Sequence, residues 1–283
     1  MDFSFLRENI QPYWNRAAIK IDVESALVEK FPDLNQFLSY FSHHFKDNFW
    51  QEVISVPANA SKIGDDGTVQ QYMNVDLHFA RELYSQGFSI CFADLSSEIH
   101  QIKLIKGMAA DVFGYSQSII VTAYLSPPNS TGVLHFDRQH NVFIQRSGVK
   151  RWFVSNKPGL ANPHDNLVYT GITKSKIESL EASGASIEIP SDCGVSRHTL
   201  EPGEALYVPP GFYHSPETLN QPSLHYTLTF EPVCFWKDFQ NRLDYLLEGP
   251  DRELFQDYRM LDDNAKSELF ERCFRLLKSR VLL

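Results

Sequence analysis

Apolar and polar side chains alternate in several short segments of the chain, and this pattern predicts β-strands. Successive side chains of a strand point to opposite faces, so one face of each segment can pack against a core. Turn-forming residues separate the segments, as Ser147-Gly148 does between two of them. The predicted strands are residues 88–93, 118–125, 141–146, 149–154 and 205–208.

Helical spacing of apolar residues is found mainly outside these segments. Residues 1–52 are predicted to be largely helical, with Pro32 separating one helix from the next, and to cover the strands. Two further helices are predicted at residues 80–87 and 97–113, each ended by a glycine. The chain is therefore predicted to be mainly β with flanking helices.

Two domains or segments are predicted along the chain: a catalytic domain at residues 1–234 and a C-terminal helical segment at residues 235–283. The 283 residues, 43% of them hydrophobic, are ample for a sizeable core. Residues 155–197 are rich in Pro, Gly, Ser and Asn and are predicted to form an insertion with one short helical stretch at 175–182. Long insertions of this kind tend to carry specificity.

Charge and cysteine content exclude several classes of protein. The formal net charge is −9 and no basic block occurs, so nucleic acid is a poor partner. The N-terminus lacks a basic region followed by a long apolar core, and no run of about eighteen apolar residues exists. We therefore expect a cytoplasmic protein without a membrane partner. No C-x-x-C pair occurs among the four cysteines, which argues against a disulfide framework or a zinc ribbon.

A candidate metal site begins at His135-Phe136-Asp137. On a strand, residues at i and i+2 share a face, so His135 and Asp137 can both reach one metal ion. Gly203, Pro209, Gly211 and His214 fit the spacing G-x5-P-x-G-x2-H, in which a turn, a buried strand and a bend return His214 toward the first pair.

Two histidines and one carboxylate form the ligand set of non-haem Fe(II) oxygenases, because three protein ligands leave positions open for a co-substrate and oxygen. A closed structural zinc site would need a fourth ligand. The remaining histidines are interpreted as bystanders and not as metal ligands, because they face away from the pair, stand alone near a helix start or lie in loop-like sequence. They are His78, His140, His164, His198 and His225.

Lys150 is the candidate anchor for an acidic co-substrate. It follows His135 by fifteen positions and alternates with Val149 and Arg151, so one basic residue can point into a barrel while the other faces solvent. A solvated Lys-Arg pair at a strand edge is the alternative interpretation. Tyr124, in the preceding strand, either lines the same pocket or is a buried aromatic with its hydroxyl bonded to backbone.

These motifs, between about Ser118 and Pro232, resemble the JmjC, or cupin-like, branch of the Fe(II)- and 2-oxoglutarate-dependent oxygenases. The His135-Phe136-Asp137 motif, Lys150-Arg151-Trp152 and the segment 206–214 are similar to ribosomal-protein arginine hydroxylases. Asn141 and Lys150 resemble the positions through which asparaginyl hydroxylases hold 2-oxoglutarate. The resemblance implies a double-stranded β-helix, or cupin barrel, with Fe(II) bound by the triad and 2-oxoglutarate paired with Lys150.

Two positions depart from the pattern of these families. Gly132 stands where many relatives carry a small hydroxyl residue three positions before the first histidine. Thr229 stands fifteen positions after the last histidine, where relatives often carry Asn. We predict Lys150, Asn141, Tyr124 and Thr229 as co-substrate residues, and the resemblance leaves the second contact to the co-substrate carboxylate open.

The implied activity is hydroxylation of an unactivated C–H bond, on a protein or peptide side chain. A small metabolite or natural product as substrate, demethylation of a methylated lysine, and a cupin-like metal-binding protein without oxygenase activity remain as alternatives. Lys150 beside a complete triad argues against the metal-binding protein without oxygenase activity. A buried ammonium that faces inward is costly unless an acidic ligand pairs with it. The C-terminal segment has two amphipathic stretches, which either pack on the barrel or, as the resemblance implies, form a homodimer.

Overall fold

The computed structural model describes residues 3–38, 58–64, 68–96, 99–114, 119–169, 187–231 and 262–280. The chain divides into two compact units, residues 1–231 and 232–283, and each is described by itself.

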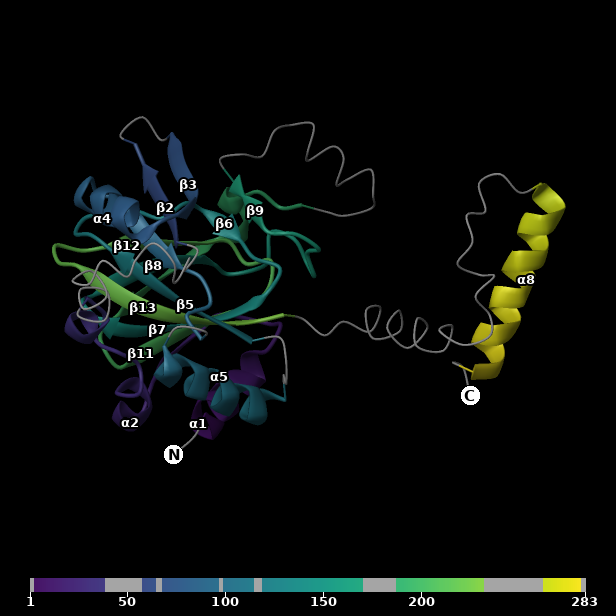
Figure 1. The fold of residues 1–283 in the computed structure, drawn as a ribbon, viewed down its shortest axis with the longest axis horizontal. Helices are drawn as coiled ribbons and strands as arrows, with labels where there is room; N and C mark the ends of the chain where they lie inside the picture. Colours follow the sequence, from purple (N-terminus) through teal and green to yellow (C-terminus); the bar gives the residue numbers. More distant parts are fainter. Residues whose placement is uncertain are drawn as a thin grey trace. The chain divides into compact units, whose positions relative to one another are not determined.

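The first unit is built on two antiparallel sheets (Figure 1). The larger sheet has the strand order β1-β11-β7-β13-β5-β4-β2-β3, and the smaller has the order β10-β8-β12-β6-β9. The strands of the larger sheet are β1 Ile19–Asp22, β2 Ala58–Ile63, β3 Val69–Val75, β4 Ser89–Phe92, β5 Ile119–Ser126, β7 His140–Ser147, β11 Glu204–Val208 and β13 Ser223–Phe230. Those of the smaller sheet are β6 His135–Phe136, β8 Lys150–Ser155, β9 Leu167–Val168, β10 Val195–Leu200 and β12 His214–Thr218.

Apolar side chains from both sheets meet between them. Phe143 of β7 stacks on Trp152 of β8, with ring centroids 4.0 Å apart and an interplanar angle of 21°. Leu206 of β11 and Val154 of β8 belong to the same buried cluster. Two facing antiparallel sheets with a shared interior form a jelly-roll barrel, which confirms the predicted fold class.

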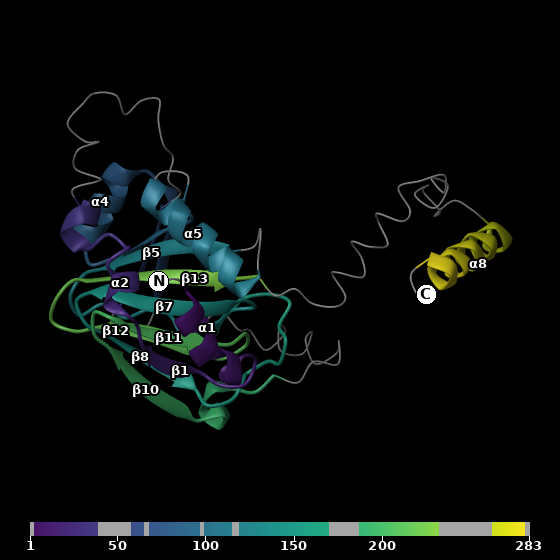
Figure 2. The same ribbon diagram turned by 90° about the horizontal axis from the view of Figure 1, so that it is seen from below.

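Helices cover the outer face of the larger sheet (Figure 2). Leu6 and Ile10 of the first helix and Ile102 of α5 are buried in one cluster with Val121 and Tyr226 of the sheet. The helix α5 ends where Gly114 adopts a left-handed conformation with φ of 75°, as its glycine predicted. The helices of this unit are α1 Ser4–Ile10, α2 Ser25–Val28, α4 Leu77–Ser85 and α5 His100–Phe113, with a 3-10 helix at Gln11–Tyr13.

The N-terminal part of the fold differs from its prediction. Residues 1–52 were expected to be largely helical, but residues 19–22 form β1, which pairs with β11 at the edge of the larger sheet. The hairpin of β2 and β3 was not predicted. Nearly every side chain of β3 is partly or fully exposed, so the strand lacks the alternation that identifies a half-buried strand.

Three other expectations concern segments whose description is incomplete. The helical stretch predicted at 175–182 and the first amphipathic stretch of the C-terminal segment lie outside the described residues. The insertion predicted at 155–197 is not wholly irregular, because it contains β9 and the start of β10.

In the second unit, residues 263–280 form the helix α8. Phe270 and Phe274 on it are exposed, so the predicted packing or homodimerisation of this segment stays a prediction. Within the described residues, no helix is long and apolar enough to cross a membrane. The predicted cytoplasmic location is not tested by that finding.

Candidate active site

A cavity of about 350 Å³ opens into the first unit, and both sheets contribute residues to its lining. His135, Asp137 and His214 line it together with Lys150 and the hairpin residues Asn59, Ala60, Ser61, Gln71 and Met73. Every residue predicted for the site lines this one cavity, including Asn141, Tyr124 and Thr229.

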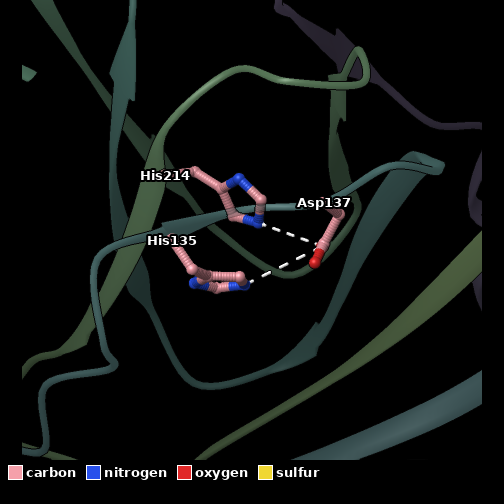
Figure 3. Close-up of side chains that lie close together, drawn as sticks. All are labelled: His135, Asp137 and His214. Carbon is pink, nitrogen blue, oxygen red and sulfur yellow. Dashed lines mark ion pairs between the residues drawn. The ribbon is translucent and has the colours of Figure 1, made fainter. Parts of the chain in front are cut away.

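Strand pairing brings the two histidines of the predicted triad together. His214 on β12 pairs directly with His135 on β6, and their rings lie with centroids 4.3 Å apart. Asp137 follows His135 by two positions, and its Oδ2 atom lies 3.8 Å from His135 Nε2 and 3.5 Å from His214 Nε2 (Figure 3). One potential ligand atom from each of the three residues lies within 4.8 Å of the others.

Backbone hydrogen bonds set the tautomer of both histidines. His135 Nδ1 donates to the carbonyl of Val133 at 2.8 Å, and His214 Nδ1 donates to the carbonyl of Phe212 at 3.0 Å. The lone pair of each ring therefore lies on Nε2, the nitrogen that faces Asp137. A metal-bound histidine typically donates its other ring N–H in this way, which fixes the orientation of the ring.

A chain of side chains orients the carboxylate of Asp137. Thr229 Oγ1 donates to Asn141 Oδ1 at 2.8 Å, and Asn141 Nδ2 donates to Asp137 Oδ2 at 2.7 Å. Burial raises the pKa of Asp137, but the adjacent His135 and His214 and the Asn141 amide outweigh it, so the pKa is held at about 2. The carboxylate is thus ionised and fixed in place.

This donor set fits Fe(II). Two imidazole nitrogens from the neighbouring strands β6 and β12 and one carboxylate oxygen from Asp137, just after β6, converge here, and no further His, Cys, Asp or Glu joins them among the residues described. Three ligands with free positions beside them suit an octahedral ion with open sites better than a closed tetrahedral zinc site.

Lys150 lies at another part of the cavity and is buried, with 2% of its surface exposed. Its Nζ donates to Ser126 Oγ and to His225 Nδ1, both at 3.0 Å. Arg151, the next residue, points the other way and pairs with Glu217 at 3.2 Å. Burial lowers the pKa of Lys150 to about 7. The alternation along β8 therefore places the lysine inward and the arginine outward.

Tyr124 extends this polar end of the cavity. Its ring stacks on that of His225, with centroids 4.9 Å apart and an interplanar angle of 4°. Its hydroxyl lies close to the thiol of Cys91, and both residues line the cavity.

Gly132 is explained by its neighbour on β12. A Cβ atom at this position would lie 2.6 Å from the Cγ and Cδ atoms of Pro216, closer than real contacts allow. A serine or threonine at position 132 would therefore require Pro216 to move. With glycine there, this position supplies no hydroxyl group to the cavity.

The other histidines lie apart from the triad. His140 is buried against Trp14, with ring centroids 3.9 Å apart, and its Nδ1 is hydrogen-bonded to the Tyr207 hydroxyl at 2.9 Å. His225 lines the cavity beside Lys150. The sequence predicts His225 to be a bystander and does not indicate Thr227 or Trp152 as site residues, yet all three line the cavity. The alternation along β13, which puts residues 225, 227 and 229 on one face of the strand, is the feature of the sequence that could have indicated these residues.

Comparison with known proteins agrees with this geometry. Residues 99–235 match the family model of the JmjC domain. Over 279 residues the chain is 24% identical to the uncharacterized protein YxbC of Bacillus subtilis, covering 93% of this chain and 80% of that protein. Ribosomal oxygenase 1 of Rattus norvegicus is 35% identical over 118 residues, which are 41% of this chain but only 17% of that protein.

Among solved structures, the ribosomal oxygenase YcfD of Escherichia coli in complex with cobalt and 2-oxoglutarate has the same fold. The TM-score is 0.59 at 16% identity, and the match covers 96% of this chain and 66% of that one. The resemblance to the JmjC oxygenases that the motifs indicate is thus confirmed over residues 99–235, and it identifies the enzyme as an Fe(II)- and 2-oxoglutarate-dependent oxygenase.

Proposed function

We propose that this JmjC oxygenase hydroxylates an unactivated C–H bond on a side chain of a protein or peptide. In this proposal His135, Asp137 and His214 bind Fe(II), and Lys150 binds the far carboxylate of 2-oxoglutarate. The observation that carries it is the presence of a preformed two-histidine, one-carboxylate set and a buried ammonium in one cavity.

Different residues of the cavity have different roles in this proposal. The Nε2 atoms of the two histidines and the Asp137 carboxylate hold the metal, while Asn141 and Thr229 keep that carboxylate in one orientation. Fe(II) and 2-oxoglutarate, when bound, supply the oxidising chemistry that transfers one oxygen atom of O2 to a C–H bond. The barrel wall, including Phe143 and Trp152, screens this chemistry from water.

The lining favours a substrate group without positive charge. Asp137 is the sole Asp or Glu among the described residues that line the cavity, and it belongs to the metal set. Of the residues that line the cavity, Gln71, Met73, Asn166 and Val168 are the exposed ones, so neutral polar and apolar groups meet an entering substrate. A cationic methyl-lysine or arginine would find no free carboxylate there, which argues against demethylation.

The names of two similar proteins support a protein substrate. Ribosomal oxygenase 1 and YcfD are both named as ribosomal oxygenases. The exposed hairpin of β2 and β3 beside the cavity gives a peptide a surface to lie on, with Tyr72 and Met73 exposed on β3.

The test measures the incorporation of labelled oxygen from O2 into proteins. Purified protein with Fe(II), ascorbate and 2-oxoglutarate is incubated with a cell lysate under ¹⁸O₂, and proteins are screened by mass spectrometry for one labelled oxygen atom. The His135→Ala variant serves as the inactive control. We expect a labelled peptide only with the unmodified enzyme, and succinate formation that rises when this peptide is added. Oxidation of free small molecules alone would support the metabolite hydroxylase and contradict the protein substrate.

A further inference from the structure

We infer that Thr227 and His225 on β13 complete the site for the far carboxylate of 2-oxoglutarate. Thr227 donates its hydroxyl to this carboxylate, and His225 is a positioning residue that holds the Lys150 ammonium toward it. The inference rests on the proposed function and identifies the second contact, which the sequence motifs left open.

Thr227 has a buried hydroxyl that no protein group satisfies. The residue is 3% exposed and lines the cavity, and its Oγ1 has no hydrogen-bond partner among the described residues. Trp152 Nε1 is likewise buried and without such a partner, and the residue lines the same cavity. A buried polar group without a partner is costly, so two of them around one cavity point to a ligand that supplies acceptors.

The strand geometry places these groups around Lys150. Residues 225, 227 and 229 share one face of β13, and residues 150 and 152 share one face of β8. All five line the cavity. Thr229 is already engaged with Asn141, so Thr227 is the threonine of β13 whose hydroxyl remains for a ligand.

The absence of a side chain at Gly132 makes this second donor necessary. No hydroxyl is available from that position, because Pro216 occupies the space that a Cβ atom would need. A carboxylate has two oxygens with several acceptor sites, so a lysine alone leaves it incompletely bonded. Thr227 supplies the missing hydrogen bond from a different strand.

His225 determines where the ammonium of Lys150 points. An ammonium has three N–H donors, and those to Ser126 and His225 account for two of them. To accept from Lys150, His225 Nδ1 must carry a lone pair, which makes the ring neutral with its proton on Nε2. The ring itself is held by stacking on Tyr124 and by the edge-on ring of Trp152 at 5.4 Å. The third N–H of Lys150 is left for the co-substrate.

The test compares two ligands that differ only at the far end. Calorimetric titration of the Co(II)-loaded protein is carried out with 2-oxoglutarate and with 2-oxopentanoate, in which a methyl group replaces the far carboxylate. We expect Thr227→Val to weaken 2-oxoglutarate binding about tenfold, the scale of losing a hydrogen bond to a charged group. Binding of 2-oxopentanoate should be unchanged, and Thr227→Ser should restore the affinity for 2-oxoglutarate.

Thr122→Val is the matched control. Thr122 is a buried threonine that pairs with Thr227 across β5 and β13 but is not among the described residues that line the cavity. It should bind both acids as the unmodified protein does. An unchanged affinity of Thr227→Val for 2-oxoglutarate, or an equal loss for both acids, would overturn the role of Thr227.

The positioning role of His225 is tested with two variants. His225→Phe keeps an aromatic ring for stacking but removes the acceptor, and His225→Gln keeps an acceptor. We expect the phenylalanine variant to lose affinity for 2-oxoglutarate but not for 2-oxopentanoate, and the glutamine variant to recover much of that loss. Equal behaviour of the two variants would contradict the role of the Nδ1 acceptor.

Failure of the proposed function would look different. If the unmodified Co(II)-loaded protein bound neither acid, the site would not be a 2-oxo acid site at all. If it bound both acids with equal affinity, the 2-oxo acid site would stand and the carboxylate site of Lys150 and Thr227 would be rejected.

Discussion

The two ends of the cavity differ in how completely their polar side chains are hydrogen-bonded within the protein. At the metal end, His135, His214 and Asp137 each have a hydrogen bond that fixes their orientation before any ligand arrives. At the Lys150 end the ammonium is held by two partners, while Thr227 Oγ1 has no partner among the described residues. The side chains of the metal end are oriented by protein hydrogen bonds, whereas the Lys150 end keeps a hydroxyl donor available for a ligand.

The difference follows from the chemistry that each end is proposed to serve. A metal ion requires ligands at fixed distances and angles, and orienting groups behind the ligands provide them. A carboxylate brings its own acceptors, so a site for it must keep donors free. The cost appears at Lys150, where burial lowers the pKa to about 7. Removing a group at either end should therefore have different consequences.

The largest effect is expected at the metal end. His135→Ala or Asp137→Ala should reduce iron-dependent succinate formation to the level seen without added iron, because two ligands do not hold the ion in place. Metal content and succinate are measured, with circular dichroism to show that the fold is retained. His78→Ala is the control, since that side chain is 81% exposed. Full iron occupancy in both triad variants would reject the triad.

The next effect is at the opposite end. Lys150→Met keeps the volume of the stem but removes the charge, and should weaken 2-oxoglutarate binding roughly a hundredfold, within the 2–5 kcal/mol typical of truncating a buried charged partner. Affinity for the metal should change little. The measurement is titration of the Co(II)-loaded variant with 2-oxoglutarate. An unchanged affinity would reject Lys150 as the partner of the carboxylate.

Replacing Asn141 tests whether this residue supports the metal ligands or contacts the co-substrate. Asn141→Ala removes the amide that orients Asp137, and should weaken metal binding about 10- to 100-fold, as is typical for groups behind metal ligands. Thr229→Val removes the outer hydroxyl of the same chain and should have a smaller effect. A loss of 2-oxoglutarate affinity with intact metal affinity would instead support the predicted direct contact of Asn141 with the co-substrate.

A pH dependence is the smallest effect. Because the pKa of Lys150 is about 7 in the free protein, its ammonium is lost as the pH rises above 7, and 2-oxoglutarate affinity should fall by up to about tenfold per pH unit. The titratable partner of Lys150, His225, does not titrate in this range, because burial and then Lys150 hold its pKa well below the usual value. Lys150→Met should show no such slope.

The same titration affects stability in the free protein. The unfolded chain binds a proton on Lys150 up to its ordinary pKa of 10.5, while the folded chain releases it near 7. The free energy of unfolding contributed by this group therefore rises between pH 7 and 10.5. Urea unfolding of the unmodified protein and of Lys150→Met across this range isolates that contribution, and equal pH slopes would contradict it.

The residue pattern predicted a mainly β fold and the local pairs of site residues, while the barrel was implied by the resemblance to the JmjC oxygenases. The i, i+2 spacing of His135 and Asp137 and the alternation of Lys150 with Arg151 are properties of a single strand, so they could be inferred without knowing any partner strand. The same holds for α5, whose apolar spacing and terminal Gly114 lie within one segment.

Other features depend on contacts between distant strands. The four residues of β1 form a strand because β11 lies beside them, and a pattern so short cannot distinguish strand from helix. His225 was interpreted as a bystander because its role depends on Lys150, 75 positions earlier in the chain. The unpaired hydroxyl of Thr227 is visible only once the neighbours on three strands are known.

The most direct test of the account is anaerobic titration of the Fe(II)-loaded protein with 2-oxoglutarate, followed by visible absorption. We expect a weak metal-to-ligand charge-transfer band for the unmodified protein, the same band at higher 2-oxoglutarate concentration for Lys150→Met, and no band for His214→Ala. A protein that retains Fe(II) but develops no band, or a His214→Ala variant that develops it unchanged, would contradict the proposed site.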